Sequence, residues 1–573
     1  MAGVSRTGLF RTGSDIATRL AVWRAGLTAP ATGFASQPEP RTIGMVSRGR
    51  QMLAGNVQLA GHLVTTPGTS LWDIPAPDTS FAAEAHGFAW LDDLAAVGDG
   101  PARQLAQAWV WGWIARFGTG KGAGWLPDLT GRRLIRLINH AIFLLNARDA
   151  AQSSGFYASL TRQTVLLSRR WPSAPAGLPR FEALCGLIYA GLSLLGMQAL
   201  VGPASAALAQ DCTHQIDSAG GIPSRNPEDL LEVFTLLIWA AEALQTAGHP
   251  VPPAHQAAIL RIAPALRALR HGDGALARMH GGGRGADGRL DQALASAGGK
   301  AVALDGIAMG FARLHAARTS VIADVAAPPP GPHAHASTLG FELTSGRRPL
   351  VVSCGSGRSF GTDWQRAGRA TPSHATLCID GTSSSRLGPA DTFAQTARIT
   401  ALRLFPGTGE QGVYAAHDGW AATHGLTHAR TLTLSADGRH LDGDDRLHAA
   451  TATQADRFAA TIARTGLQGL RFAIRFHLHP DVDATLDMGG HAVSLALKSG
   501  EIWVFRHSGQ AQLALQPSVY LERGRLHPRP ATQIVLDCHT ADIDTRIGWT
   551  LAKAQDTPTA IRDLGRDDGM GAF

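Results

Sequence analysis

The sequence predicts a chain in two parts, with a helical region first and a large antiparallel β-sandwich second. Between about residues 80 and 320 the apolar residues recur at helical spacing, and beyond about residue 330 they alternate with a period of two. Helices followed by strands form separate packed layers rather than a wound parallel sheet. With 573 residues and 45% hydrophobic residues, the chain is long enough for two to four domains and a large core.

Helix signals recur through the first half. Residues 130–149 show one amphipathic face behind Thr130 as a cap, which predicts a single helix. A second helix start lies at Asn226, which can cap the helix that begins with Pro227. Two acidic residues follow, near the positive end of the helix dipole. Gly248 and Pro250 end that helix, and further helices are expected over residues 253–270 and 304–317.

Residues 183–210 contain no charged residue and are long enough to cross a bilayer. Gln198 and Pro203 dilute the hydrophobicity, and Arg180 and Glu182 lie beside one end. The segment therefore predicts a buried helix pair rather than a transmembrane span.

Turn and linker residues mark the change of period. Residues 279–299 are rich in glycine and include a GxGxxG pattern that no strand precedes, so we expect a mobile loop instead of a dinucleotide site. The sequence AAPPPGP at residues 326–332 predicts a linker between the helices and the sheet. Residues 472–478 alternate as a half-buried strand does, and residues 427–441 and 493–507 each predict a hairpin.

Composition excludes several classes of protein. The formal net charge is +7, and nearly all of the positively charged residues are arginines, which form no basic run. This pattern argues against a nucleic-acid binder and weakly favours acidic ligands. Five separated cysteines indicate reduced thiols, and HExxH, GxSxG and Walker patterns are missing. The first residues lack a secretory apolar core, which predicts a cytoplasmic protein.

Three histidines give the most informative pattern. His333 and His335 lie two residues apart, so in extended chain both project from one side of a strand start, and His374 follows in a later segment. Such a pair can present metal ligands or acid and base groups. The alternative is a surface pair in a chain with 23 histidines.

These segments resemble the heparinase II/III-like polysaccharide lyases, in a divergent bacterial branch. The resemblance lies in GPHAHASTLGFELTSGRRPLVVSCG, WQRAGRATPSHATLCIDG, GGIPSRNPEDLLE, HGDGALARMHGGG and FAIRFHLHPDV, and it extends over about residues 71–551. It implies an incomplete (α/α) toroid followed by an antiparallel β-sandwich, with the substrate between them. The implied division is a leading segment at residues 1–70, the toroid at 71–325 and the sandwich at 333–573. Related lyases also make the periplasm or cell envelope an alternative location.

The implied reaction is β-elimination of an acidic, uronate-containing polysaccharide by a carbon–oxygen lyase. The site must neutralise the uronate carboxylate, supply a base for the neighbouring proton and protonate the leaving oxygen. By resemblance, His333 is the catalytic histidine of the sandwich. The remaining candidates are three groups for the carboxylate (Arg180, Arg225 and Asn226) and four supporting or substrate-binding residues (His374, His335, Glu182 and His140). Asn226 as a helix cap, Arg180 paired with Glu182 or a neighbour, and His140 as a satisfied interior histidine are the structural alternatives.

The chain departs from the family pattern at several positions. Some members hold a structural zinc through histidines at the positions of His335 and His374 and through an acid. In this chain Ser353 occupies the position of the acid, so either Cys354 replaces the acid as a ligand or no zinc binds. Ser337 likewise replaces an aspartate. The expected catalytic tyrosine is missing, and Tyr189 lies in an apolar run that predicts packing. A non-catalytic glycan-binding protein of a cell-envelope or exopolysaccharide pathway is therefore one alternative, and a glycoside hydrolase using Glu182 and Asp229 is another.

Overall fold

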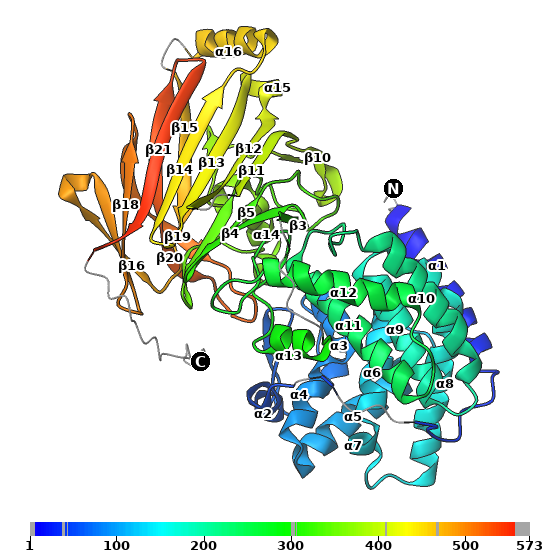
Figure 1. Ribbon diagram of the computed structural model, residues 1–573. Helices are drawn as coiled ribbons and strands as arrows, with labels where there is room; N and C mark the ends of the chain where they lie inside the picture. The colour runs from blue at the N-terminus through cyan, green and yellow to red at the C-terminus, as the bar shows by residue number, and fades with distance from the viewer. Residues whose placement is uncertain are drawn as a thin grey trace, which may run out of the picture. The chain divides into compact units, whose positions relative to one another are not determined.

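The computed structural model describes residues 6–36, 41–42, 44–298, 304, 306–406, 409–465 and 469–555. The chain forms two compact units (Figure 1). Unit 1 comprises residues 1–218, 232–262 and 295–298, and unit 2 comprises residues 219–231, 263–294 and 299–573. Helices fill the first half of the chain and strands the second, as the sequence predicts.

The helices of the first half have these bounds: α1 Arg6–Ala25, α2 Val46–Leu53, α3 Thr79–Gly87, α4 Ala89–Val97, α5 Gly100–Phe117, α6 Pro127–Asn139, α7 Ala141–Leu145, α8 Ala150–Arg170, α9 Leu178–Ser193, α10 Val201–Gln215, α11 Pro227–Thr246, α12 Pro253–Ala268 and α13 Arg289–Ser296. A short hairpin, β1 Asn56–Leu59 and β2 His62–Thr65, precedes α3. The predicted helix pair in the uncharged segment is α9 and α10. No helix of the described residues is both long and apolar enough to cross a membrane.

Two predictions for residues before 300 need correction. The single helix expected over residues 130–149 begins earlier, at Pro127, and is broken at His140, which separates α6 from α7. Thr130 therefore lies within α6 and is not its cap. The glycine-rich stretch also contains a helix, α13, instead of a continuous loop.

The predicted start of α11 is confirmed. The Oδ1 atom of Asn226 accepts hydrogen bonds from the backbone N–H groups of Glu228 (2.9 Å) and Asp229 (3.4 Å). These N–H groups have no partner within the helix, so the side chain satisfies them as an N-cap.

The strands of unit 2 have these bounds: β3 Ile307–Ala308, β4 Phe311–Ala316, β5 Thr319–Asp324, β6 Phe341–Ser345, β7 Arg348–Val351, β8 Leu377–Ile379, β9 Arg386–Leu387, β10 Phe393–Gln395, β11 Ile399–Pro406, β12 Glu410–Trp420, β13 Leu426–Ser435, β14 His440–His448, β15 Leu470–His477, β16 Val482–Asp487, β17 Ala492–Leu497, β18 Ile502–Ser508, β19 Gln512–Tyr520, β20 Arg529–Thr540 and β21 Asp544–Lys553. They form sheets of five strands (β3-β4-β5-β6-β7), eight (β11-β12-β13-β14-β21-β18-β17-β16), four (β19-β20-β15-β8) and two (β10-β9). Three further helices lie among them: α14 Thr362–Arg369, α15 Ala421–His424 and α16 Ala452–Arg464.

Both predicted hairpins are present, as β13–β14 and β17–β18, and residues 472–478 fall largely in β15. The helix expected over residues 304–317 is wrong, because this stretch forms β3 and β4. Since β5 ends at Asp324, the proline-rich segment 326–332 connects β5 to β6 within unit 2 and does not separate helices from strands.

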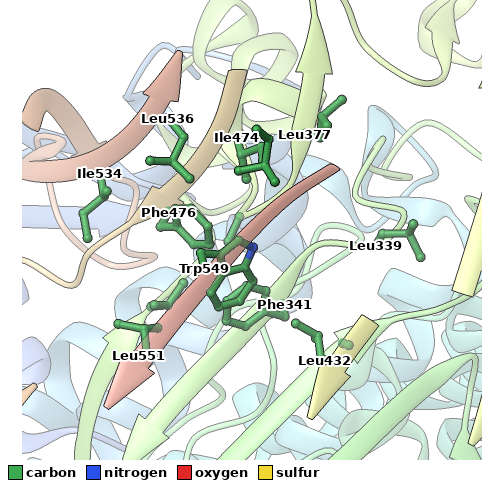
Figure 2. Close-up of a cluster of buried hydrophobic side chains, with 14 of the residues drawn as sticks. Leu339, Phe341, Leu377, Leu432, Ile474, Phe476, Ile534, Leu536, Trp549 and Leu551 are labelled. Atoms are coloured by element: carbon green, nitrogen blue, oxygen red, sulfur yellow. The ribbon is translucent and has the colours of Figure 1, made fainter. Parts of the chain in front are cut away.

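The core of unit 2 lies between its sheets (Figure 2). The ring of Trp549 on β21 stacks on Phe341 of β6, with centroids 5.5 Å apart, and meets the edge of Phe476 on β15 at 4.8 Å. Gly443 pairs with Trp549 across β14 and β21, and a Cβ atom there would lie 2.0 Å from the indole. The eight-stranded sheet therefore packs against the other two large sheets, which is the predicted sandwich.

Candidate functional site

The histidine segment is a loop between β5 and β6, so the expected strand start is absent. His333 is exposed, whereas His335 is fully buried at 0% exposure. The two side chains therefore do not share one face, and this prediction is wrong. The reason is that the proline-rich segment turns at Gly331, whose φ is 113°, instead of running straight into β6.

His335 belongs to a buried cluster with His280 and His374. The ring of His335 lies 5.9 Å from that of His280 and 5.2 Å from that of His374, centroid to centroid. Burial, followed by the neighbouring cationic groups, holds the pKa of His335 well below its usual range and lowers that of His374 to about 3. The cluster is therefore neutral at pH 7.

Hydrogen bonds fix the rings of this cluster. His335 Nε2 accepts the backbone N–H of Gly281 at 3.0 Å, and His280 Nδ1 accepts the backbone N–H of His335 at 3.1 Å. The Nδ1 atom of His374 lies 3.1 Å from Ser353 Oγ. His335 Nδ1 and His374 Nε2 are buried without a hydrogen-bond partner.

These residues do not fit a zinc ion. A metal needs an unprotonated ring nitrogen, and the one on His335 already receives the N–H of Gly281, so its other nitrogen carries the proton. Cys354 contacts His477 Nδ1 at 3.4 Å and Ser518 Oγ at 3.9 Å. Within the described ranges, no group of three or more His, Cys, Asp or Glu side chains is placed to hold a metal ion. The predicted set of His335, His374 and Cys354 is thus not assembled.

Arg225 is held inside unit 2 and does not present its guanidinium to a ligand. Its Nη2 atom donates to Asp324 Oδ1 at 2.5 Å, and its three nitrogens donate to the backbone carbonyls of Met309, Gly310 and Ala327 at 2.6–3.0 Å. The guanidinium also lies 4.8 Å from the ring centroid of Phe311. The guanidinium that the resemblance implies as a carboxylate clamp is thus bonded inside the fold, and Asn226 beside it caps α11.

Asp324 is a central residue that sequence reasoning missed. It is fully buried, and Arg225, His280 and Ser337 together hold its pKa well below its usual range against the effect of burial. The Ser337 hydroxyl donates to Oδ2 at 2.6 Å, and His280 Nε2 lies 3.3 Å from the same oxygen. Ser337, which replaces an aspartate of the family pattern, thus satisfies a buried carboxylate here.

A second buried carboxylate, Glu342 on β6, was also missed. It lies 3.5 Å from both His271 Nε2 and Arg278 Nη2, and it accepts the backbone N–H of Ser353. These interactions, led by Arg278, lower its pKa to about 2 despite burial. The segment HGDGALARMHGGG contains His271, Arg278 and His280, and these three of its ionisable residues were the available signal.

The other candidates, Arg180, Glu182 and His140, lie in unit 1. His140 Nε2 lies 2.9 Å from Asp92 Oδ1 and is 7% exposed, which confirms the interpretation as a satisfied interior histidine. Arg180 donates twice to the Ala174 carbonyl and lies 3.7 Å from Asp211, so its partner is not Glu182.

Glu182 is positioned by the close contact of α6 and α9. A Cβ atom at Gly131 would lie 2.2 Å from the Glu182 carbonyl oxygen, so the glycine lets the two backbones meet. The Glu182 carboxyl Oε1 lies 2.6 Å from Arg132 Nε. Burial raises its pKa to about 7, although Arg132 opposes the shift.

His333 remains as the accessible titratable group among the predicted site residues of unit 2. Protein atoms partly desolvate its exposed ring, and this effect together with the charges of Arg358 and Arg369 lowers its pKa to about 4. Arg369 Nε donates to the carbonyl of Ala334 at 2.8 Å. Since Ala334 directly follows His333, this bond holds Arg369 close to the backbone of the histidine. The imidazole is therefore neutral at pH 7 and lies in a positive potential.

Sequence comparison matches the chain to a known family and to a relative that aligns over most of its length. Residues 300–550 match the family described as heparinase II/III-like, C-terminal. FtsZ-localized protein C of Caulobacter vibrioides is 30% identical over 542 residues, with 91% of each chain covered.

Solved structures share the fold at low sequence identity. Heparinase III has a TM-score of 0.69 at 12% identity, with 96% of this chain and 91% of that chain covered. The heparan sulfate lyase HepC of Pedobacter heparinus has a TM-score of 0.57 at 14% identity, with 94% and 88% covered. The incomplete toroid followed by a β-sandwich is thus confirmed as the fold class, and the chain belongs to the heparinase II/III-like family.

Proposed function

We propose that the protein cleaves an acidic, uronate-bearing polysaccharide by β-elimination, with His333 as the base. The observation that carries this proposal is the exposed imidazole of His333, which directly precedes Ala334, the residue whose carbonyl accepts a hydrogen bond from Arg369. Partial burial and the charges of Arg358 and Arg369 lower the pKa of this imidazole to about 4. A neutral imidazole can accept a proton, and positive potential attracts the anionic substrate.

The reaction balances with the groups present. His333 takes the proton on the carbon beside the uronate carboxylate, and the electron pair of that C–H bond forms a carbon–carbon double bond. The bond to the glycosidic oxygen breaks with its electrons, and that oxygen takes a proton from the imidazolium or from water. A bound carboxylate adds negative charge beside His333, which raises the pKa of the imidazole from about 4 towards the working pH and strengthens the base.

A second candidate is glycan binding without cleavage. It is favoured by the engagement of Arg225 and Asn226 inside the fold, which removes two of the three predicted carboxylate groups. Tyr189 is 1% exposed and Tyr520 is 4% exposed, so neither presents its hydroxyl on the surface as a replacement for the missing tyrosine.

The test is near-ultraviolet absorbance during incubation with polymers of glucuronate, galacturonate or mannuronate, together with binding to the same polymers. Elimination creates a conjugated double bond, whereas hydrolysis and binding do not. His333→Ala is compared with the wild type and with His491→Ala, which removes another exposed histidine of unit 2.

We expect absorbance to rise with the wild type and with His491→Ala and to be lost in His333→Ala. Binding without a rise on any polymer would refute elimination and support the second candidate. Cleavage to saturated ends would indicate hydrolysis, for which the buried, ion-paired Glu182 is a poor candidate.

A further inference from the structure

A cavity of about 320 Å³ lies within unit 2, where α14 ends and β9 and β10 pair. Arg369, Ser383, Ser385, Arg386, Leu387 and Phe393 are among its lining residues. Among the described residues, none of those that line it is acidic. Its size suits one sugar residue rather than a long chain segment.

Arg369, the last residue of α14, is 1% exposed. Its Nε donates to Ala334, but Nη1 and Nη2 are both buried without a hydrogen-bond partner. The guanidinium lies 5.3 Å from the ring centroid of Phe393, which lines the same cavity. A buried cation without an acceptor is costly, so the arrangement calls for an anion.

Two other buried arginines of the described residues do not show this deficit. Arg133, at 0% exposure, donates to the Gln163 side chain and to the carbonyls of His86 and Gly124. Arg430 binds both oxygens of Asp445, at 2.8 and 2.9 Å, and donates to two further carbonyls. Within the described part of the chain, Arg369 differs because both terminal nitrogens are buried and unpaired.

Asp391 does not bond to the terminal nitrogens of Arg369. Asp391 acts on it electrostatically, raising a pKa that burial lowers, but the ion pair of Asp391 is with Arg366, at 3.4 Å. The exposed Arg386, on β9, adds a second positive charge to the cavity wall.

Two serines add hydrogen-bond donors to the same cavity. Ser383 Oγ accepts the backbone N–H of Thr371 at 3.0 Å, and Ser385 Oγ accepts that of Ala397 at 2.9 Å. Because each oxygen is held as an acceptor, its own O–H is left to donate. Guanidinium and hydroxyl donors without a lining carboxylate are the donor set of an oxyanion site.

We infer that this cavity binds the carboxylate or sulfate group of an acidic sugar, with Arg369 as the main anion contact. Arg386 and the two serine hydroxyls supply further donors, and Phe393 and Leu387 offer an apolar wall to the sugar ring. The site requires no bond cleavage, but the choice of a sugar as its ligand rests on the proposed function, in which Arg369 also contributes positive charge near His333.

The experiment is calorimetric titration of the full chain with glucuronate, glucose 6-sulfate, glucose and inorganic sulfate. We expect either or both acidic sugars to bind more tightly than glucose and inorganic sulfate, and the preferred one identifies the anion. Arg369→Gln should weaken that binding by about tenfold or more, and Arg386→Gln should weaken it less. Arg546→Gln is the control, because it removes an exposed arginine paired with Asp444 on β14.

Circular dichroism of each variant checks folding. If Arg369→Gln does not fold, Arg386→Gln carries the test, since this residue is exposed on a two-stranded sheet. Wild-type affinity in the folded Arg variants, equal binding of glucose, or binding of inorganic sulfate alone would overturn the inference. Because binding of monosaccharides is measured, none of these results depends on whether the protein cleaves a polymer.

Discussion

Arg225→Met provides a direct test of whether Arg225 is structural. The substitution removes the cation from Asp324, which has 0% exposure, and it also removes three donors to backbone carbonyls. Loss of one partner of a buried pair costs about 3–5 kcal/mol. His280 and Ser337 still contact Asp324, so we expect a value near the lower end, about 3 kcal/mol.

The assay is urea unfolding followed by tryptophan fluorescence and circular dichroism. Arg180→Met is the matched control, because its guanidinium is partly exposed and bonds one carbonyl, and we expect it to cost about 1 kcal/mol. In a double-mutant cycle with Asp324→Asn, the two losses should be non-additive by about 1 kcal/mol or more. If Arg225→Met unfolded like the wild type and lost only polysaccharide binding, Arg225 would be a substrate clamp and the reasoning above would be wrong.

Three further predictions concern the cap, the buried carboxyl and the metal. Asn226→Ala should cost about 1 kcal/mol, because two N–H groups of α11 lose their acceptor, whereas an unchanged urea midpoint would contradict the role as a cap. The folded-state pKa of Glu182 is about 7, above the ordinary 4.5, so the folded protein holds this proton more tightly and loses stability as pH rises from about 4.5 to 7. Glu182→Gln removes that loss, and its unfolding free energy relative to the wild type should rise by about 2 kcal/mol between pH 5 and 8; a pH-independent difference would refute the shift. Dialysis against a chelator should leave the melting temperature unchanged, because His335 offers no free unprotonated nitrogen; one zinc per chain, with a lower melting temperature once it is removed, would contradict this.

Local chemistry made some elements predictable. The start of α11 follows from Asn226 and Pro227, and both hairpins follow from short polar turns between apolar runs, so each depends only on neighbouring residues. The helix expected over residues 304–317 failed because long-range pairing prevailed over local spacing. Gly306 and Gly310 adopt positive φ at the ends of β3, and β4 pairs along its whole length with β5.

The site was less predictable because its partners are far apart in the sequence. Arg225 and Asp324 are separated by 99 residues, so no local pattern shows that the arginine already has a counter-ion. The alternation of His333 and His335 was visible, but their different burial depends on the turn at Gly331 and on the contact of Gly281 with His335. A family resemblance indicates which residue type occupies each position. The role of a charged side chain also depends on the groups buried beside it, which the resemblance does not give.

This dependence on burial explains why anion recognition in unit 2 falls on Arg369 and not on Arg225. Asp324 and the carbonyls around it use every nitrogen of Arg225, so an incoming carboxylate would have to displace bonds that already stabilise the fold. In Arg369, by contrast, only Nε donates a hydrogen bond, and the other two nitrogens are buried without an acceptor. Binding an anion would therefore stabilise a buried cation that the fold leaves unpaired. The same Nε–carbonyl bond fixes Arg369 beside the backbone of His333. An acidic sugar on Arg369 would therefore bring negative charge close to the one accessible imidazole among the predicted residues of unit 2.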